Sequence, residues 1–378
     1  MKVGFQHMGN LNIVLKALIE NLGCEVVLGP RPNKYSLNKG VRYAPELACL
    51  PFKVTLGDMF GALERGVDTL VFLGGGDWSC RFGYYGRVQC LILRKLGYKF
   101  KALFVSRENL KSTISEILKL SNDSWTSAIK KFLHAFTLAW YKSKCIDIAE
   151  ELSRRVRPLE KNRGESSKLL RDFLKRIENE CSICKLMHMP REIKEQFYDI
   201  KQDAGCVPLR IRLVGESYCV IEPFVNSDLI KYLGEHGVHV EPFLTAHRWL
   251  YYHWLRKDED HSLSKKKAKI LAEPFWAYGT GGEDQVSIGY AIDAAQQHFD
   301  GVIHLMPFSC MPETAALPVF ERISKLHNIP FLNITLDEHT GSEGLYTRVE
   351  AFLDLLMQRR KKTLDTCKGG RNEVFFGC

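Results

Sequence analysis

The sequence predicts an α/β protein with two pseudo-repeated Rossmann/flavodoxin-like parallel-sheet domains and a helical insertion between them. The order strand, helix, strand opens both halves of the chain. Each half later adds a buried strand, a loop with a cysteine, a helix and another strand. A long stretch without strand alternation separates the halves. Because such units place parallel strands side by side, two halves of this kind predict two parallel sheets.

In the first half of the chain, the pattern of apolar residues predicts each strand and helix. Short apolar runs predict buried strands, and apolar residues at three- and four-residue spacing predict the first helix, which the helix-stop residue Gly23 follows. A turn around Gly97 ends a later helical stretch. The expected elements are strands at 2–5, 25–28, 67–73 and 102–105, a helix at 11–22, and a helix that ends at the turn 95–98.

The second half repeats this order. A strand leads into a helix that ends near Gly234 and Gly237, and the next strand follows directly. A buried strand then precedes a cysteine loop, as it does in the first half, so Cys80 and Cys310 are pseudo-equivalent. The expected elements are strands at 211–215, 238–240, 299–305 and 331–334, a helix at 227–233, and a helix that ends at the turn 325–328.

Domain boundaries follow from these patterns. We expect an N-terminal α/β domain at 1–110, a helical insertion at 111–205 and a C-terminal α/β domain at 206–358. The insertion is rich in Lys, Glu, Leu, Ile and Ala with helical spacing. Residues 359–378 are basic and contain Gly369 and Gly370, which predicts a flexible tail.

The composition argues against a membrane protein and against a nucleic-acid-binding protein. The chain has 378 residues, 45% of them hydrophobic, and a net charge of +9. No run of about 18 apolar residues and no signal-peptide core is present, so we expect a cytoplasmic protein without a membrane segment. Basic runs alternate with acidic residues, which favours a solvated surface over nucleic-acid binding. Twelve cysteines in a reducing compartment favour free thiols or metal ligands.

Three cysteines stand in loops suited to presenting a thiolate. Cys49, Cys80 and Cys310 each lie in a short run of Gly, Pro and aromatic residues. Prolines stiffen two of these loops, and Gly75 and Gly76 allow close backbone approach before Cys80. Three thiolates would suit an iron–sulfur cluster with one open iron position. Ordinary loop cysteines fit the residues alone equally well.

Neighbouring residues are candidates for supporting roles. Arg81 beside Cys80 would stabilise a thiolate or anchor its loop, and we take Arg81 and Glu313 as candidate catalytic residues. Gly281 and Gly282 precede a helix-like segment and could place backbone N–H groups against a cofactor, or form a plain loop and helix cap. The acidic run 337–339 favours a hydrogen-bonded loop over proton transfer.

The remaining cysteines have simpler interpretations. Cys181 and Cys184 form a C-x-x-C pair with His188 downstream, which could hold zinc or exchange disulfides. No second pair stands at zinc-ribbon spacing, so we interpret this one as incidental. Five others fit core positions in apolar or strand-like surroundings. They are Cys24, Cys90, Cys145, Cys206 and Cys219.

The cysteine loops and several further stretches resemble a known family. The chain is similar to the activase-related proteins akin to the cluster-bearing subunits of 2-hydroxyacyl-CoA dehydratase and benzoyl-CoA reductase. The matching stretches cover both α/β halves and hardly touch the helical insertion. They are residues 7–10, 42–53, 80–86, 222–226, 304–313 and 336–344.

The resemblance implies a [4Fe-4S] cluster at the junction of the two domains, held by Cys49, Cys80 and Cys310. It also implies that a separate ATP-dependent activase donates electrons for reduction or dehydration of a small substrate. The chain lacks the phosphate loops of an activase, so we expect it to be the electron acceptor. Asp77 stands where many relatives carry another cysteine, which leaves open a double-cubane cluster.

Other functions fit the same residues. The chain could be a non-catalytic electron-transfer or scaffold subunit that docks an activase or dehydratase partner, or a zinc-binding protein that uses the same cysteines. The resemblance further implies a homodimer or pairing with a paralogous subunit.

Overall fold

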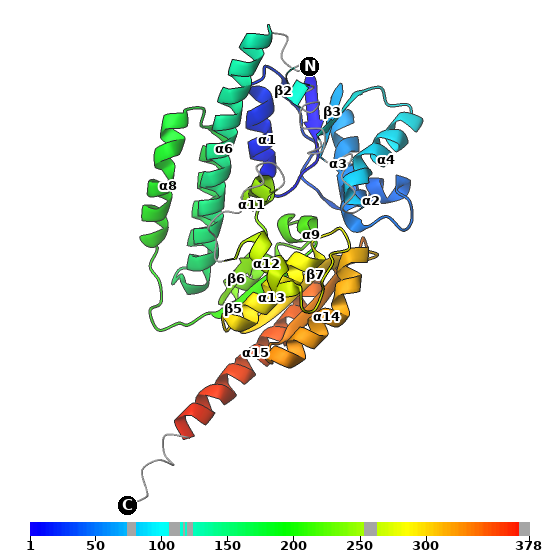
Figure 1. Ribbon diagram of the computed structural model, residues 1–378. Helices are drawn as coiled ribbons and strands as arrows, with labels where there is room; N and C mark the ends of the chain where they lie inside the picture. The colour runs from blue at the N-terminus through cyan, green and yellow to red at the C-terminus, as the bar shows by residue number, and fades with distance from the viewer. Residues whose placement is uncertain (74–80, 106–113, 116–117, 119–123, 253–262, 370–378) are drawn as a thin grey trace, which may run out of the picture.

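Two four-stranded parallel sheets form the frame of the molecule (Figure 1). The computed structural model describes residues 1–73, 81–105, 114–115, 118, 124–252 and 263–369. The first sheet has the order β2-β1-β3-β4 and the second β6-β5-β7-β8. The strands are β1 (Lys2–Phe5), β2 (Glu25–Val26), β3 (Thr69–Leu73), β4 (Lys101–Val105), β5 (Leu209–Gly215), β6 (Val238–Pro242), β7 (Gly301–Pro307) and β8 (Phe331–Leu336). This identical order confirms the predicted fold class.

Each sheet has its own set of helices, and we call a sheet with its helices the N-terminal or the C-terminal domain. In the N-terminal domain these are α1 (Leu11–Glu20), α2 (Lys34–Tyr43), α3 (Leu50–Leu63) and α4 (Phe82–Lys95). In the C-terminal domain they are α9 (Ser217–Ile221), α10 (Leu229–Glu235), α11 (Ala246–Leu250), α12 (Lys265–Ala272), α13 (Asp284–Gln296), α14 (Met311–His327) and α15 (Ser342–Gly369).

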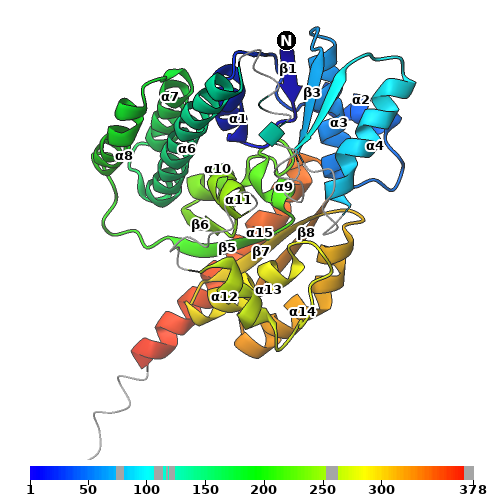
Figure 2. The same ribbon diagram turned by 45° about the horizontal axis from the view of Figure 1, so that its top comes forward.

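The helical insertion contains α6 (Trp125–Val156), η1 (Arg157–Leu159), α7 (Glu165–Asn179) and α8 (Ile183–Tyr198). Figure 2 shows α6, α7 and α8 together beside α1, and α6 also packs against α11 and β6. Asn10 donates a hydrogen bond to Glu150 at 2.7 Å, and Thr245 donates one to Asp147 at 2.6 Å. Helix α6 therefore binds both domains through two neighbouring carboxylates.

The repeat extends to the packing of the central helices. Helices α3 and α13 are buried along almost their whole length, and each is crossed closely by a neighbour, α2 or α12. A Cβ atom on Gly40 of α2 would lie 1.8 Å from the Lys53 carbonyl oxygen, and one on Gly289 of α13 would lie 1.9 Å from that of Ala268. Glycine is therefore required at both crossings.

One expectation about the cysteines is wrong, and part of the predicted tail is helical. Helix α15 continues to Gly369, so it includes residues 359–369. Arg360 explains part of this order, because its guanidinium bonds Asp300 and the carbonyl of Pro208. Cys206 is exposed rather than in the core, since it lies in the connection that precedes β5.

Four other cysteines confirm the core interpretation, because Cys24, Cys90, Cys145 and Cys219 are buried. Within the part of the chain that the structure describes, none of the helices has the length and apolar character needed to span a bilayer.

Replacing Gly289 with Ala should destabilise the C-terminal domain by about 2 kcal/mol or more, because the new methyl group meets backbone that cannot move aside. Urea denaturation followed by circular dichroism measures this change. Gly344→Ala in α15 is the matched control, since a Cβ there meets no atom within 4 Å. This control should be neutral or slightly stabilising. Equal effects of the two variants would contradict the packing argument.

Candidate functional site

Cys49 and Cys310 occupy equivalent local positions, each at the start of a helix. Cys49 is the N-cap of α3 and Cys310 is the N-cap of α14. Each is followed two residues later by a proline, Pro51 or Pro312, which fits a first helical turn because it needs no backbone acceptor. The positive end of each helix dipole therefore lies beside a sulfur atom.

Three loops from distant parts of the chain meet at these cysteines. The Arg81 guanidinium donates a hydrogen bond of 2.5 Å to the carbonyl of Ser309. The Ser309 hydroxyl donates a bond of 3.2 Å to the carbonyl of Leu47. These contacts join the residue that follows Cys80 to the loops that carry Cys310 and Cys49. We call this junction the thiol site.

The thiols are largely buried. The Cys49 sulfur lies 2.7 Å from the Tyr85 hydroxyl of α4. Burial raises the pKa of the Cys310 thiol strongly, and the charges of Glu216, Glu313 and Cys49 raise it further. Burial also raises the pKa of Cys219, with contributions from Glu216, Cys49 and Cys310. Cys219 is therefore a third thiol in electrostatic contact with the site.

Glu216, which is half-buried, and Glu313, which is fully buried, lie near the thiols. Burial raises the pKa of Glu216 to about 7, although its carboxylate accepts the backbone N–H of Cys219 at 2.9 Å. Burial likewise raises the pKa of Glu313, while a bond of 2.7 Å to His304 Nε2 opposes the shift. The other oxygen of Glu313 has no hydrogen-bond partner. Both groups thus favour the protonated form more than an exposed carboxyl does.

The structure brings several of the predicted site residues together. Cys49, Cys310 and Arg81 meet at the thiol site, and Glu313 lies buried in the first turn of α14. A Cβ on Gly282 would lie 2.6 Å from Pro312, so the loop containing Gly281 and Gly282 packs against the start of α14. Cys80, Gly75 and Gly76 lie outside the described residues.

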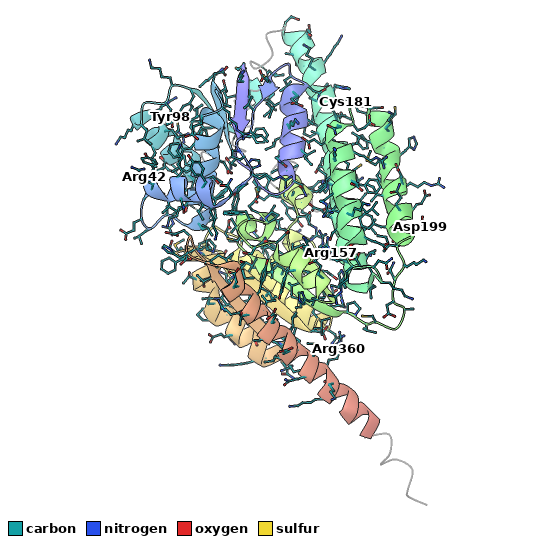
Figure 3. The ribbon with its side chains drawn as sticks, turned by 180° about the vertical axis from the view of Figure 1, so that it is seen from behind. Arg42, Tyr98, Arg157, Cys181, Asp199 and Arg360 are labelled. Atoms are coloured by element: carbon teal, nitrogen blue, oxygen red, sulfur yellow. The ribbon has the colours of Figure 1, made fainter. Side chains whose placement is uncertain are left out.

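Other predicted residues lie elsewhere. Cys181 and Cys184 are exposed at the start of α8, and Figure 3 shows Cys181 on the helical insertion. Among the residues that the structure describes, no three His, Cys, Asp or Glu side chains are grouped so as to hold a metal ion. The predicted set of three cysteines includes Cys80, so it stays a prediction.

Sequence reasoning missed Glu216, Cys219 and His304 as neighbours of the site. Glu216 directly follows β5, at the carboxyl end where parallel sheets bind ligands, so its position after a strand was an available signal. Cys219 and His304 carry no comparable signal, because a lone cysteine and a strand histidine are usually core residues.

An ion pair behind Cys49 connects the two domains. Lys53 on α3 donates a bond of 2.5 Å to Glu338 in the loop between β8 and α15, and the two side chains are 7% and 19% exposed. Burial opposes ionisation of Glu338, yet the bond to Lys53 holds its pKa below the usual value. The acidic run 337–339 therefore forms an interdomain contact.

The fold and the site define a two-domain α/β protein that presents cysteine thiols at the junction of its parallel sheets. The chain belongs to the family of the CoA enzyme activase uncharacterised domain (DUF2229), whose model matches residues 7–244. The model of the 2-hydroxyglutaryl-CoA dehydratase D-component matches residues 183–356. These matches confirm the resemblance inferred from the sequence. No curated protein matches the chain.

Replacing Lys53 with Met should lower the free energy of unfolding by about 2 kcal/mol at pH 7, because Glu338 is left without its partner in a largely buried position. The deficit should shrink as the pH falls below about 4.5, where the unpaired Glu338 is protonated and needs no cation. Chemical denaturation at pH 7 and pH 4 measures both values. Lys53→Arg should keep most of the stability, and a pH-independent deficit would contradict the role of the ion pair.

Proposed function

We propose that the chain is a 2-hydroxyacyl-CoA dehydratase-like subunit that accepts low-potential electrons from an ATP-dependent activase in the cytoplasm. A [4Fe-4S] cluster held by Cys49, Cys80 and Cys310 would receive these electrons and serve the reduction or dehydration of a small substrate. The matches to an activase-related domain and to a dehydratase D-component support the dehydratase-like subunit.

The observation that carries this proposal is the convergence of the cysteine loops. The residue after Cys80, the residue before Cys310 and the loop of Cys49 are joined by two hydrogen bonds. These loops come from both domains, so a cofactor bound there would lie at the domain junction. Parallel sheets bind ligands at this kind of position, beyond the carboxyl ends of their strands.

The chemistry of the described donors fits an iron–sulfur cluster. Thiolates are its ligands, and burial holds Cys310 in the uncharged thiol form unless a cation is present. Two helix N-termini and the Arg81 guanidinium supply positive charge beside the sulfurs. The residues present therefore suit a negatively charged cluster better than they suit free thiolates.

Such a cluster supplies one-electron transfer and an open iron position for a substrate oxygen. The chain itself supplies the side chains that would surround the cluster. The Tyr85 hydroxyl orients the Cys49 sulfur at 2.7 Å, and the Arg81 guanidinium fixes the loop of Cys310 through the Ser309 carbonyl. The raised pKa of Glu216, about 7, leaves this carboxyl partly protonated near neutral pH.

A role in docking a partner has its own supporting observation. Leu47, Phe308 and Met311 are 70%, 61% and 55% exposed, and all three belong to the loops of the thiol site. Exposed apolar side chains around a redox centre favour contact with another protein. We infer that the activase docks on these three residues, which form the apolar rim. A non-catalytic electron-transfer subunit would use the same surface.

Iron content tests the cluster directly. Protein purified without oxygen should contain about four irons and four sulfides per chain, whereas a double cluster would contain about eight irons. Cys49→Ser and Cys310→Ser should abolish most of this iron, because each removes a ligand. Cys181→Ser/Cys184→Ser is the control and should retain it. Iron-free protein with stoichiometric zinc would replace the proposal with the zinc alternative.

Charge on the apolar rim should block docking without disturbing the cluster. In Leu47→Glu/Met311→Glu, we expect activase-dependent reduction to slow by roughly tenfold or more, because a buried apolar contact is lost. Reduction by dithionite and the iron content should stay unchanged. Met187→Glu on α8 is the control, since Met187 is also exposed but lies on the helical insertion. Equal rates in all proteins would reject the rim as the docking surface.

A further inference from the structure

Tyr85 on α4 contacts a sulfur of the thiol site directly. Its hydroxyl lies 2.7 Å from Cys49 Sγ, and in the free thiol either atom could donate the hydrogen bond. A thiolate that binds iron carries no proton, so the Tyr85 hydroxyl is then the donor. The contact therefore becomes a charge-assisted hydrogen bond that stabilises negative charge on the Cys49 sulfur.

The packing of α4 on α3 holds the Tyr85 ring in this position. The ring meets Phe52 edge-on, with 4.8 Å between the ring centroids, and it also contacts Phe82 at 5.7 Å. One turn later, the buried Gln89 side chain donates hydrogen bonds of 3.1 and 2.7 Å to the Phe52 carbonyl and to Thr55 Oγ1. Helix α4 is thus bonded to the first two turns of α3.

The Cys310 sulfur receives a hydrogen bond from the backbone instead. The N–H of Glu313, in the first turn of α14, donates to this sulfur. A backbone donor of this kind stays in place whatever the side chain is. The Tyr85 hydroxyl is a side-chain donor, so a single substitution removes it without changing the backbone.

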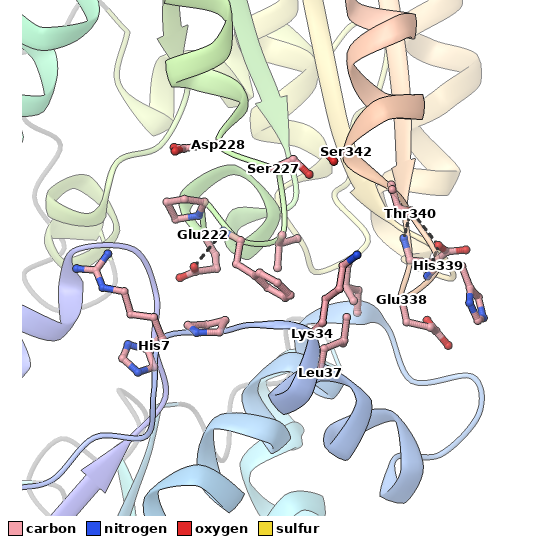
Figure 4. Close-up of a pocket in the computed structure, with 18 of the residues that line it drawn as sticks. His7, Lys34, Leu37, Glu222, Ser227, Asp228, Glu338, His339, Thr340 and Ser342 are labelled. Carbon is pink, nitrogen blue, oxygen red and sulfur yellow. Dashed lines mark hydrogen bonds between the residues drawn. The ribbon is translucent and has the colours of Figure 1, made fainter. Parts of the chain in front are cut away.

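The hydrogen bond between Tyr85 and Cys49 is sheltered from the cleft between the domains. Figure 4 shows this cleft of about 700 Å³, with walls from both domains. Leu50, the residue after Cys49, lines the cleft, but Cys49 and Tyr85 do not. Cys49 is 9% exposed and Tyr85 is half-buried. A sheltered hydrogen bond is electrostatically stronger than one that competes with water.

Hydrogen bonds to the sulfurs are among the features that set the reduction potential of an iron–sulfur cluster. In the reduction, one electron leaves a low-potential reductant and enters the cluster, and no covalent bond forms or breaks. The cluster and its thiolate ligands then carry one more negative charge. A donor beside a sulfur stabilises this charge, so it favours the reduced form over the oxidised form.

We propose that the Tyr85 hydroxyl raises the reduction potential of the cluster by donating a hydrogen bond to the Cys49 sulfur. This inference rests on the proposed function, since it requires a cluster bound by Cys49. Tyr85 is a positioning residue, because it acts on the cluster through Cys49. It regulates the thiol site by setting how strong a reductant must be to deliver an electron there.

Redox titration of the full chain, purified without oxygen and followed by electron paramagnetic resonance, tests the proposal. Tyr85→Phe should lower the equilibrium constant for one-electron reduction about three- to tenfold, which makes the midpoint potential about 30 to 60 mV more negative. Tyr84→Phe is the matched control, because Tyr84 is the neighbouring residue in α4 but is 59% exposed. This control should keep the potential of the wild-type protein.

A second variant keeps both the ring and the hydroxyl. Tyr85→3-fluorotyrosine makes the hydroxyl a stronger donor, so the potential should rise above the wild-type value, and this variant decides the matter if Tyr85→Phe loses its iron. Wild-type potentials in iron-loaded Tyr85→Phe, or in the fluorinated variant, would overturn this inference and leave the proposed function standing. Iron-free wild-type protein would overturn the proposed function and this inference with it.

Discussion

The contact between the carboxyl ends of two parallel sheets is the constraint on which the rest of this structure depends. Strand ends bring backbone N–H and carbonyl groups to the junction, and buried polar groups must find partners there. Gly9 after β1 therefore bonds Glu222 of the loop after α9. At the exposed side of the junction, Ser309 after β7 bonds the carbonyl of Leu47 before α3. Helix α6 strengthens the same junction by bonding both domains.

Burying this junction leaves acidic groups in a low-dielectric interior. Burial raises the pKa of Asp58, Glu216 and Glu313, and the hydrogen bonds that each receives offset only part of that rise. Buried acids of this kind are neutral more readily than exposed ones, so they tolerate the neighbouring thiols without strong repulsion. The junction is therefore polar in composition, and its buried acids carry a negative charge less readily than exposed acids do.

Helix α3 connects the thiol site with the cleft of about 700 Å³ that lies between the two domains. It begins after Cys49, its first residue Leu50 lines the cleft, and Lys53 one turn later pairs with Glu338 of the opposite domain. Helix α3 also packs tightly on α2, because a Cβ on Gly57 would lie 2.2 Å from the Ser36 carbonyl oxygen. One helix therefore contacts the thiol site, the cleft and the opposite domain.

Local pattern in the sequence was enough to predict the sheets, the repeat and the cysteine loops. Strand and helix periods are properties of neighbouring residues, and the prolines near Cys49 and Cys310 indicate stiff loops. No such local pattern predicts the contacts between the two domains. Arg81 meets Ser309, and Lys53 meets Glu338, across more than 200 residues of chain. Only the packing of one domain on the other decides which polar groups are buried together, and therefore where Glu216, Cys219 and the cleft between the domains lie.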